Sequence, residues 1–134
     1  MFEQTARAHA KYIWSDPEGE GRNRWVLFRR EFRLAGRPVS GALNIFADTR
    51  YRLSVNGRVV CHGPARFFVA GPEYDTVDLT PYLRPGRNAI AAIVNSYGCL
   101  NFHSEISLGG LIAWGAAVDD AGHTVPIATD ETWR

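Results

Sequence analysis

Apolar and polar residues alternate along much of the chain, and this period of two is typical of strands that bury one face. In segment 25–34, Phe28, Phe32 and Leu34 share one face with Arg30, whereas the other face is largely charged. Further short segments with strand-like patterns occur at 12–14, 42–48, 51–55, 58–62, 66–69, 74–79, 88–95, 111–118 and 124–128. Turn residues separate these segments roughly every 8–12 residues, which predicts an all-β sandwich of about eight or nine strands.

Two turns can be predicted from residue type. Asn56 and Gly57 separate two strand-like segments, and a type I′ hairpin turn requires residues that accept positive φ at both central positions. Thr80 followed by Pro81 predicts one helical turn, with Thr80 as its N-cap. Segment 88–95 is the most apolar, so we expect a central strand covered on both faces. No segment is long enough for a helix that packs on a sheet, so we predict a single β domain over residues 1–134.

The composition argues against several classes of protein. An apolar share of 46% and a charged share of 22% are those of an ordinary soluble domain. The net charge of +1 argues against a nucleic-acid partner. No apolar run approaches the ~20 residues that span a bilayer. The first residues include Glu3 and do not resemble a secretory signal, so we expect a cytoplasmic protein without a membrane partner.

Metal and nucleophile chemistry have little support. The four histidines lack cysteines or carboxylates at ligand spacing, so no zinc site is predicted. Cys61 and His62 are neighbours on a strand-like segment and would point to opposite faces. Cys61 and Cys99 could pair, but without an export signal two reduced thiols are favoured.

Acidic residues could in principle pair for glycoside hydrolysis, and the candidates are Glu73, Asp75, Asp78 and Glu105. Asp78, however, stands just before the predicted turn and is expected to accept hydrogen bonds from its amides. A small sandwich also offers no deep cleft that would shift carboxylate pKa values. We therefore predict no catalytic residue in this chain.

A sugar-binding site requires aromatic or apolar faces together with side chains that bond hydroxyl groups. Loops at the end of a sandwich are common places for such sites. The candidate residues come from loop 96–110 and one other loop, and they are Arg66, Tyr97, Asn101, His103 and Glu105. Alternatively, Tyr97 and Phe102 pin the loop to the core while its polar groups bond loop backbone, and this alternative is slightly favoured. Trp114 alternates with apolar residues and is expected in the core, whereas Trp25 could be buried or contact a ligand.

Several short motifs occur in an order and spacing that resemble a known family. In the first half they are Tyr12-Ile13-Trp14, Leu27-Phe28-Arg29-Arg30-Glu31-Phe32, the hairpin from Ala47 to Gly57, and Gly63-Pro64-Ala65-Arg66. In the second half they are the stretch from Tyr74 to Leu83, Pro85-Gly86-Arg87-Asn88, and the stretch from Thr129 to Arg134. Together they resemble the N-terminal galactose-binding-like jelly-roll domain of bacterial α-L-rhamnosidases, the family 78 glycoside hydrolases.

The resemblance implies a non-catalytic domain placed ahead of an (α/α) barrel that carries the catalytic carboxylates. The implied partner is that catalytic domain of the same parent chain, and the implied role is to pack against it. Candidate residues for the interface are Arg29, Arg33, Arg50, Arg52 and Arg66, which could equally be solvated strand residues.

The alternative function is a carbohydrate-binding module that recognises rhamnose or a related sugar through loop 96–110. Some related modules bind rhamnose with a calcium ion. No calcium ligand set matches here residue by residue, so no cofactor is predicted and calcium is left open.

Overall fold

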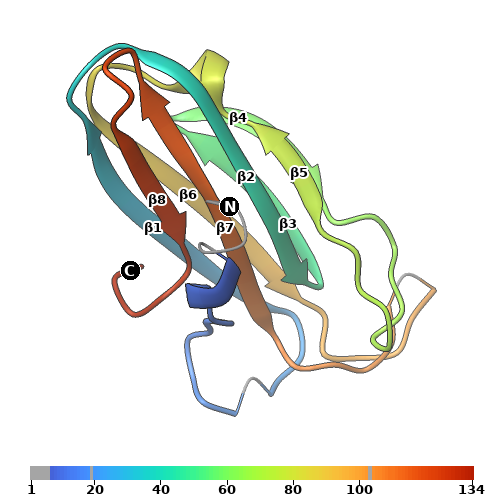
Figure 1. Ribbon diagram of the computed structural model, residues 1–134. Coiled ribbons are helices and arrows are strands. Elements are labelled where there is room, and N and C mark those ends of the chain that lie inside the picture. The colour runs from blue at the N-terminus through green and yellow to red at the C-terminus, as the bar shows by residue number, and fades with distance from the viewer. Residues whose placement is uncertain (1–6, 19, 103) are drawn as a thin grey trace.

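The computed structural model describes residues 7–18, 20–102 and 104–134. Within these residues, eight strands form two four-stranded antiparallel sheets (Figure 1). Sheet I has the order β1-β6-β3-β4, and sheet II has the order β5-β2-β7-β8. The strands are β1 (Arg24–Leu34), β2 (Pro38–Asp48), β3 (Arg50–Val55), β4 (Arg58–Gly63), β5 (Asp75–Asp78), β6 (Gly86–Ser96), β7 (Gly110–Asp119) and β8 (Thr124–Ala128). The predicted all-β sandwich is confirmed.

The core lies between the two sheets and is made by the inward-facing residues, which alternate with outward-facing ones along the strands. Leu43 and Ile45 of β2 face Leu53 and Val55 of β3, and Ile90 of β6 joins them, all without exposed surface. Each such side chain contributes roughly 1.5–3 kcal/mol through burial. The apolar face predicted for segment 25–34 is also confirmed, because Phe28, Phe32 and Leu34 are buried.

The hairpin turn between β3 and β4 also anchors the hairpin to its neighbours. Asn56 and Gly57 have φ values of 51° and 80°, as predicted for this turn. The Asn56 side chain donates to the Tyr82 carbonyl at 2.8 Å and to Asn88 Oδ1 at 2.9 Å, and it accepts from the Ala89 amide. Asn56 therefore ties the hairpin to β6 and to the 3-10 turn η1 (Thr80–Tyr82).

Three details of the predicted elements are wrong. Residues 66–69 form no strand and instead lie in a loop, and segment 12–14 makes only one isolated bridge, from Ile13 to Leu111. Leu79 rather than Thr80 occupies the N-cap position of η1, because the Thr80 hydroxyl accepts the Gly41 amide at 3.0 Å.

Strand β6 is central in sheet I, as expected, but only one of its faces is fully covered. Its inward residues are buried, whereas the outward Ala89, Ala91 and Ile93 are half-buried. The small side chains of Ala89 and Ala91 line a pocket on this face. The outer face of sheet I is therefore an accessible surface.

Two tryptophans are buried at different places in the fold. Trp133 is buried in the core, and its indole nitrogen donates to the Ala128 carbonyl at 2.8 Å. Trp114 is buried too, but it lies outside the core, on the outer face of sheet II beneath the ring of Tyr74. Burial of Trp114 was predicted correctly and its location was not. No helix in the described part of the chain is long and apolar enough to cross a membrane.

Candidate functional site

An open cleft of about 580 Å³ lies on the outer face of sheet I. We call it the sheet I cleft, and its lining residues are Trp25, Arg50, Tyr51, Arg52, His62, Ile93, Asn95 and Tyr97. The strand register brings most of them together, because Trp25 and Arg50 stand opposite Asn95 of β6. In the neighbouring row Arg52 lies between Ile93 and His62.

Trp25 is 66% exposed, yet its ring is held in place. Its indole nitrogen donates to Asn23 Oδ1 at 3.2 Å, and Asn95 Nδ2 donates to the same oxygen at 3.1 Å. The Asn23 amide donates to the Tyr97 carbonyl at 3.0 Å. Asn23 adopts a φ of 49°, which asparagine tolerates better than most residues. Asn23 thus links Trp25 to Asn95 and Tyr97 and holds an exposed aromatic ring in place.

The charges of the sheet I cleft are of one sign. Its lining contains Arg50 and Arg52 and no acidic residue. Neither guanidinium has an ion pair or hydrogen bond among the described residues. Elsewhere on this sheet face Glu31 neutralises Arg29 and Arg87. Arg50 and Arg52 therefore remain available to a ligand in the cleft.

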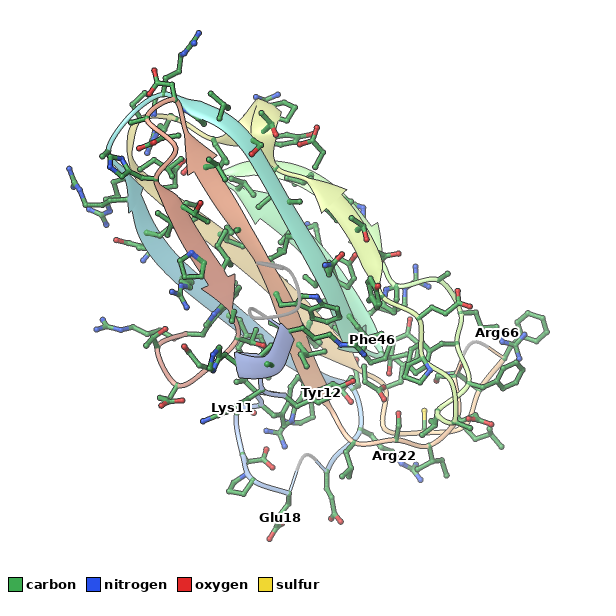
Figure 2. All side chains as sticks on the ribbon, viewed as in Figure 1. Lys11, Tyr12, Glu18, Arg22, Phe46 and Arg66 are labelled. Carbon is green, nitrogen blue, oxygen red and sulfur yellow. The ribbon has the colours of Figure 1, made fainter. Side chains whose placement is uncertain are left out.

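A second exposed surface lies at one end of the sandwich, where loops 64–74 and 97–109 run side by side (Figures 1 and 2). We call it the loop-end patch and define it by five large apolar side chains that are 61–79% exposed: Phe68, Leu100, Phe102, Ile106 and Leu108. The Val69 amide donates to Glu105 Oε2 at 2.8 Å and so joins the two loops. Clustered exposure of this kind marks interaction surfaces on soluble proteins.

The predicted sugar-binding residues are divided between these two surfaces. The Arg66 guanidinium lies 5.1 Å from the centre of the Phe102 ring, beside the loop-end patch. Glu105 bonds the neighbouring loop, and Asn101 Oδ1 accepts the Ser104 amide at 3.0 Å. Tyr97 belongs to the sheet I cleft instead. His103 lies outside the described residues. Their roles in sugar or interdomain contact stay predictions.

A buried carboxylate that the sequence reasoning missed lies at the end of β2. Asp48 Oδ1 accepts from Ser107 Oγ at 2.7 Å and from Thr49 Oγ1 at 3.1 Å. Burial raises the pKa of Asp48, and these two hydrogen bonds oppose that shift. Asp48 also lines a pocket of about 480 Å³ with Tyr12 and Phe46, whose labelled side chains meet at the base of the sandwich (Figure 2). No other carboxylate lines this pocket among the described residues, so it lacks the acid pair of a glycosidase.

Two of the acidic candidates serve the fold. The Tyr51 hydroxyl donates to Asp75 Oδ2, and burial together with this bond raises the pKa of Tyr51. Asp78 Oδ1 accepts the Thr80 amide at 2.9 Å, as predicted. In the described ranges no group of three or more metal-ligating side chains occurs, and calcium stays an open expectation of the resemblance.

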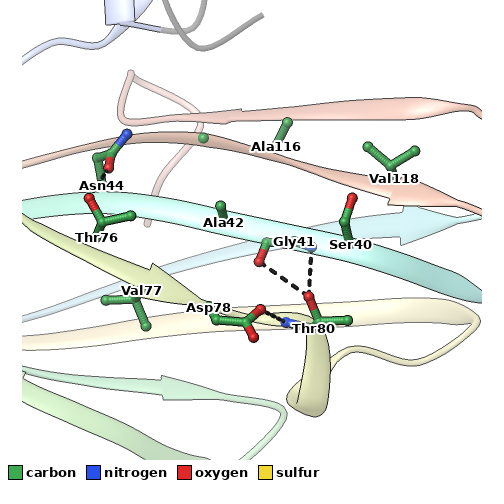
Figure 3. A pocket seen from close by; sticks show the side chains of 11 residues that line it. Ser40, Gly41, Ala42, Asn44, Thr76, Val77, Asp78, Thr80, Ala116 and Val118 are labelled. Carbon is green, nitrogen blue, oxygen red and sulfur yellow. Dashed lines mark hydrogen bonds between the residues drawn. The ribbon is translucent and has the colours of Figure 1, made fainter.

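A groove of about 610 Å³ lies on the outer face of sheet II. Figure 3 shows that small side chains line it and that its polar groups bond one another. Thr76 donates to Asn44 at 2.7 Å, and Thr80 joins Asp78 and Gly41. The groove offers neither an aromatic face nor a charged cluster for a ligand.

The comparisons with known proteins confirm the family resemblance. A GH78 family rhamnosidase of Bacillus sp. GL1 is 41% identical, with a TM-score of 0.81, over 94% of this chain and 13% of its own. An α-L-rhamnosidase from Aspergillus terreus is 26% identical, with a TM-score of 0.72, over 93% of this chain and 16% of its own. A lectin from Pleurotus ostreatus, solved with GalNAc, shares the fold at 19% identity and a TM-score of 0.71, over 93% of this chain and 35% of its own.

The chain therefore spans only a small part of the solved enzymes that it resembles. No protein-family model matches the chain, and no curated protein does. The similarity is that of one domain within a multidomain rhamnosidase, and the activity of the whole enzyme does not transfer to it directly.

Proposed function

We propose that this chain is a non-catalytic accessory domain of a family 78 glycoside hydrolase and packs against another domain of that enzyme through the loop-end patch. The observation that carries this proposal is the cluster of five exposed apolar side chains in two bonded loops. The length of the similar enzymes supports it, because this chain covers only 13–16% of them.

The chemistry of the patch suits a lasting interface. Leu100, Phe102 and Ile106 are each more than 70% exposed in the chain on its own. Roughly 25 cal/mol is gained for each Å² of such apolar surface that a partner removes from water. Aromatic side chains with arginine are also enriched in interfaces, and Arg66 over Phe102 provides that combination.

The absence of catalysis in this chain is part of the proposal. The described carboxylates with assigned bonds, such as Asp75 and Asp78, serve the fold. The purified chain should not turn over an aryl α-L-rhamnoside under conditions in which the parent enzyme does. Turnover that follows the chain through purification would overturn this part of the proposal.

The packing is tested in the parent enzyme with a triple variant, Leu100→Ser, Phe102→Ser and Ile106→Ser. We expect calorimetry to show that this domain unfolds separately and at a lower temperature, because contacts with its partner domain no longer stabilise it. The control is Val39→Ser with Val59→Ser, which changes two exposed apolar residues of β2 and β4 outside the patch. Identical unfolding of the triple variant and the unaltered enzyme would contradict the proposal.

The alternative function, sugar recognition by loop 96–110, is less well supported by the contacts. Glu105 and Asn101 bond backbone groups of the loops. Arg66 already lies over Phe102. A ligand at this place would have to compete with those interactions.

A further inference from the structure

We infer that the sheet I cleft binds a sugar that carries a carboxylate group, with Trp25 as the stacking surface and Arg50 and Arg52 as the anion ligands. This inference does not rest on the docking proposal, because the cleft and the loop-end patch share no residue.

The first argument is the exposed and fixed ring of Trp25. A large aromatic side chain that is 66% exposed leaves apolar surface in water, and its indole nitrogen is already bonded to Asn23. One ring edge is thus satisfied by the protein, while much of the ring surface stays open. The apolar C–H face of a pyranose ring fits such a platform. Because Asn23 and Asn95 hold the site before any ligand arrives, little side-chain freedom is lost on binding.

The second argument is the charge of the cleft. Arg50 and Arg52 lie two residues apart on β3, so both project from the outer face of sheet I. A guanidinium matches the planar geometry of a carboxylate and can donate two parallel hydrogen bonds to it. Glu31 plays that part for Arg29 and Arg87 on the same face, whereas no acidic residue lines the cleft. The carboxylate of a ligand would pair with Arg50 and Arg52 in the same way.

The third argument is the combination of both features in one space. The volume of about 580 Å³ lies within the usual range for small-molecule sites. The Tyr97 hydroxyl and the His62 ring add groups that can bond sugar hydroxyls. A small anion would contact the arginines without Trp25, and a neutral sugar would stack on Trp25 without an ionic contact to the arginines. A uronic acid can make both contacts.

The experiment titrates the 134-residue chain with three compounds and follows tryptophan fluorescence and NMR shifts. D-galacturonic acid supplies ring and carboxylate, D-galactose the ring alone, and sodium acetate the carboxylate alone. We expect D-galacturonic acid to bind about tenfold tighter than either of the others, because charge-assisted hydrogen bonds are the stronger kind. Added salt should weaken its binding. Equal affinity for galacturonic acid and galactose, equal affinity for acetate, or no binding at all would each overturn the inference.

Variants separate the two contributions. Trp25→Ala should abolish binding, and its control Leu27→Ala removes the next exposed apolar residue on the same strand face. Arg50→Ala with Arg52→Ala should bring galacturonic acid down to the affinity of galactose, a loss of about tenfold. Its control, Arg33→Ala, removes an exposed arginine of β1 outside the cleft. Unchanged binding in both cleft variants would contradict the inference.

Asn23→Gly tests the positioning of the ring, since glycine keeps the positive φ and removes the side chain that holds Trp25. We expect several-fold weaker binding together with altered tryptophan fluorescence of the free chain. Unaltered binding and fluorescence would show that Asn23 does not preorganise the cleft. The triple loop-end variant should bind sugar normally, so failure of this inference and failure of the docking proposal remain distinguishable.

Discussion

At the end of the sandwich that carries the β3–β4 hairpin, short connections bond their polar side chains to the fold. The side chains of Asn56, Asn88 and Asp119 each make several hydrogen bonds there. At the opposite end, loops 64–74 and 97–109 are longer and expose the apolar loop-end patch. We therefore expect stability to depend more on the hairpin end, whereas the other end can present surface to a partner. Removing a bonded polar side chain should therefore lower the free energy of unfolding more at the hairpin end than at the loop end.

The largest effect is expected for Asn88→Ala. Asn88 is fully buried, and its amide makes four hydrogen bonds, to Arg84 twice, to Gly86 and to Asn56. Alanine removes all four hydrogen bonds from a fully buried position and leaves a void there, so the free energy of unfolding should fall by about 3 kcal/mol. Denaturant unfolding measures this loss.

The matched change at the loop end is Asn101→Ala. Asn101 is exposed, and the substitution removes the hydrogen bond that its Oδ1 accepts from the Ser104 amide. We expect it to lower the free energy of unfolding by less than about 1 kcal/mol. Equal losses for Asn88→Ala and Asn101→Ala would break the contrast between the two ends.

A smaller effect with a distinct pH dependence is expected for Asp119→Asn. Burial raises the pKa of Asp119, but hydrogen bonds from the His123 and Gly36 amides outweigh it, and the net pKa is lowered from 3.8. The ionised carboxylate therefore stabilises the fold fully above pH 3.8, and this contribution disappears as the pH falls through the lower folded pKa.

Asparagine removes the charge, so we expect thermal unfolding several degrees lower at neutral pH and a reduced loss of stability in acid. Glu73→Gln is the control, since Glu73 is an exposed acid in loop 64–74. An Asp119→Asn variant with the same acid-induced decline as the unaltered chain would be inconsistent with the assigned role.

The smallest effect on stability for each substituted residue is expected for Leu100→Ser, Phe102→Ser and Ile106→Ser in the isolated chain. Exposed substitutions change the free energy of unfolding by about 0.5 kcal/mol each or less. Binding of a fluorescent hydrophobic dye should nevertheless decrease, because the apolar surface is reduced. A large drop in stability would mean that these side chains support the fold and are unsuited to docking.

Much of the fold could be predicted from the sequence because strand patterns and turn chemistry act over short distances. The alternation of Phe28, Phe32 and Leu34 identified a strand and its buried face. Asn56-Gly57 identified the hairpin from its backbone requirement alone. The strand predicted at 66–69 is wrong because the segment is short and carries no turn or pairing signal of its own. A short apolar segment of this kind is equally compatible with a loop.

The candidate surfaces were harder to predict because they depend on contacts between distant segments. Tyr97 was named from its loop, but strand pairing places it beside Trp25, Arg50 and Arg52. Asp48 is hydrogen-bonded by Ser107, which is 59 residues away in the sequence. Sequence alone indicated the residue types that a sugar site needs and could not tell which of them share a surface.

The most direct test of the docking account compares amide hydrogen exchange in the isolated chain and in the parent enzyme. We predict slower exchange in loops 64–74 and 97–109 within the parent enzyme, with unchanged exchange around Asn56 and Gly57 at the hairpin end. Equal exchange of both loops in the two proteins, or protection confined to the hairpin end, would contradict the claim that the loop-end patch packs against the rest of the enzyme.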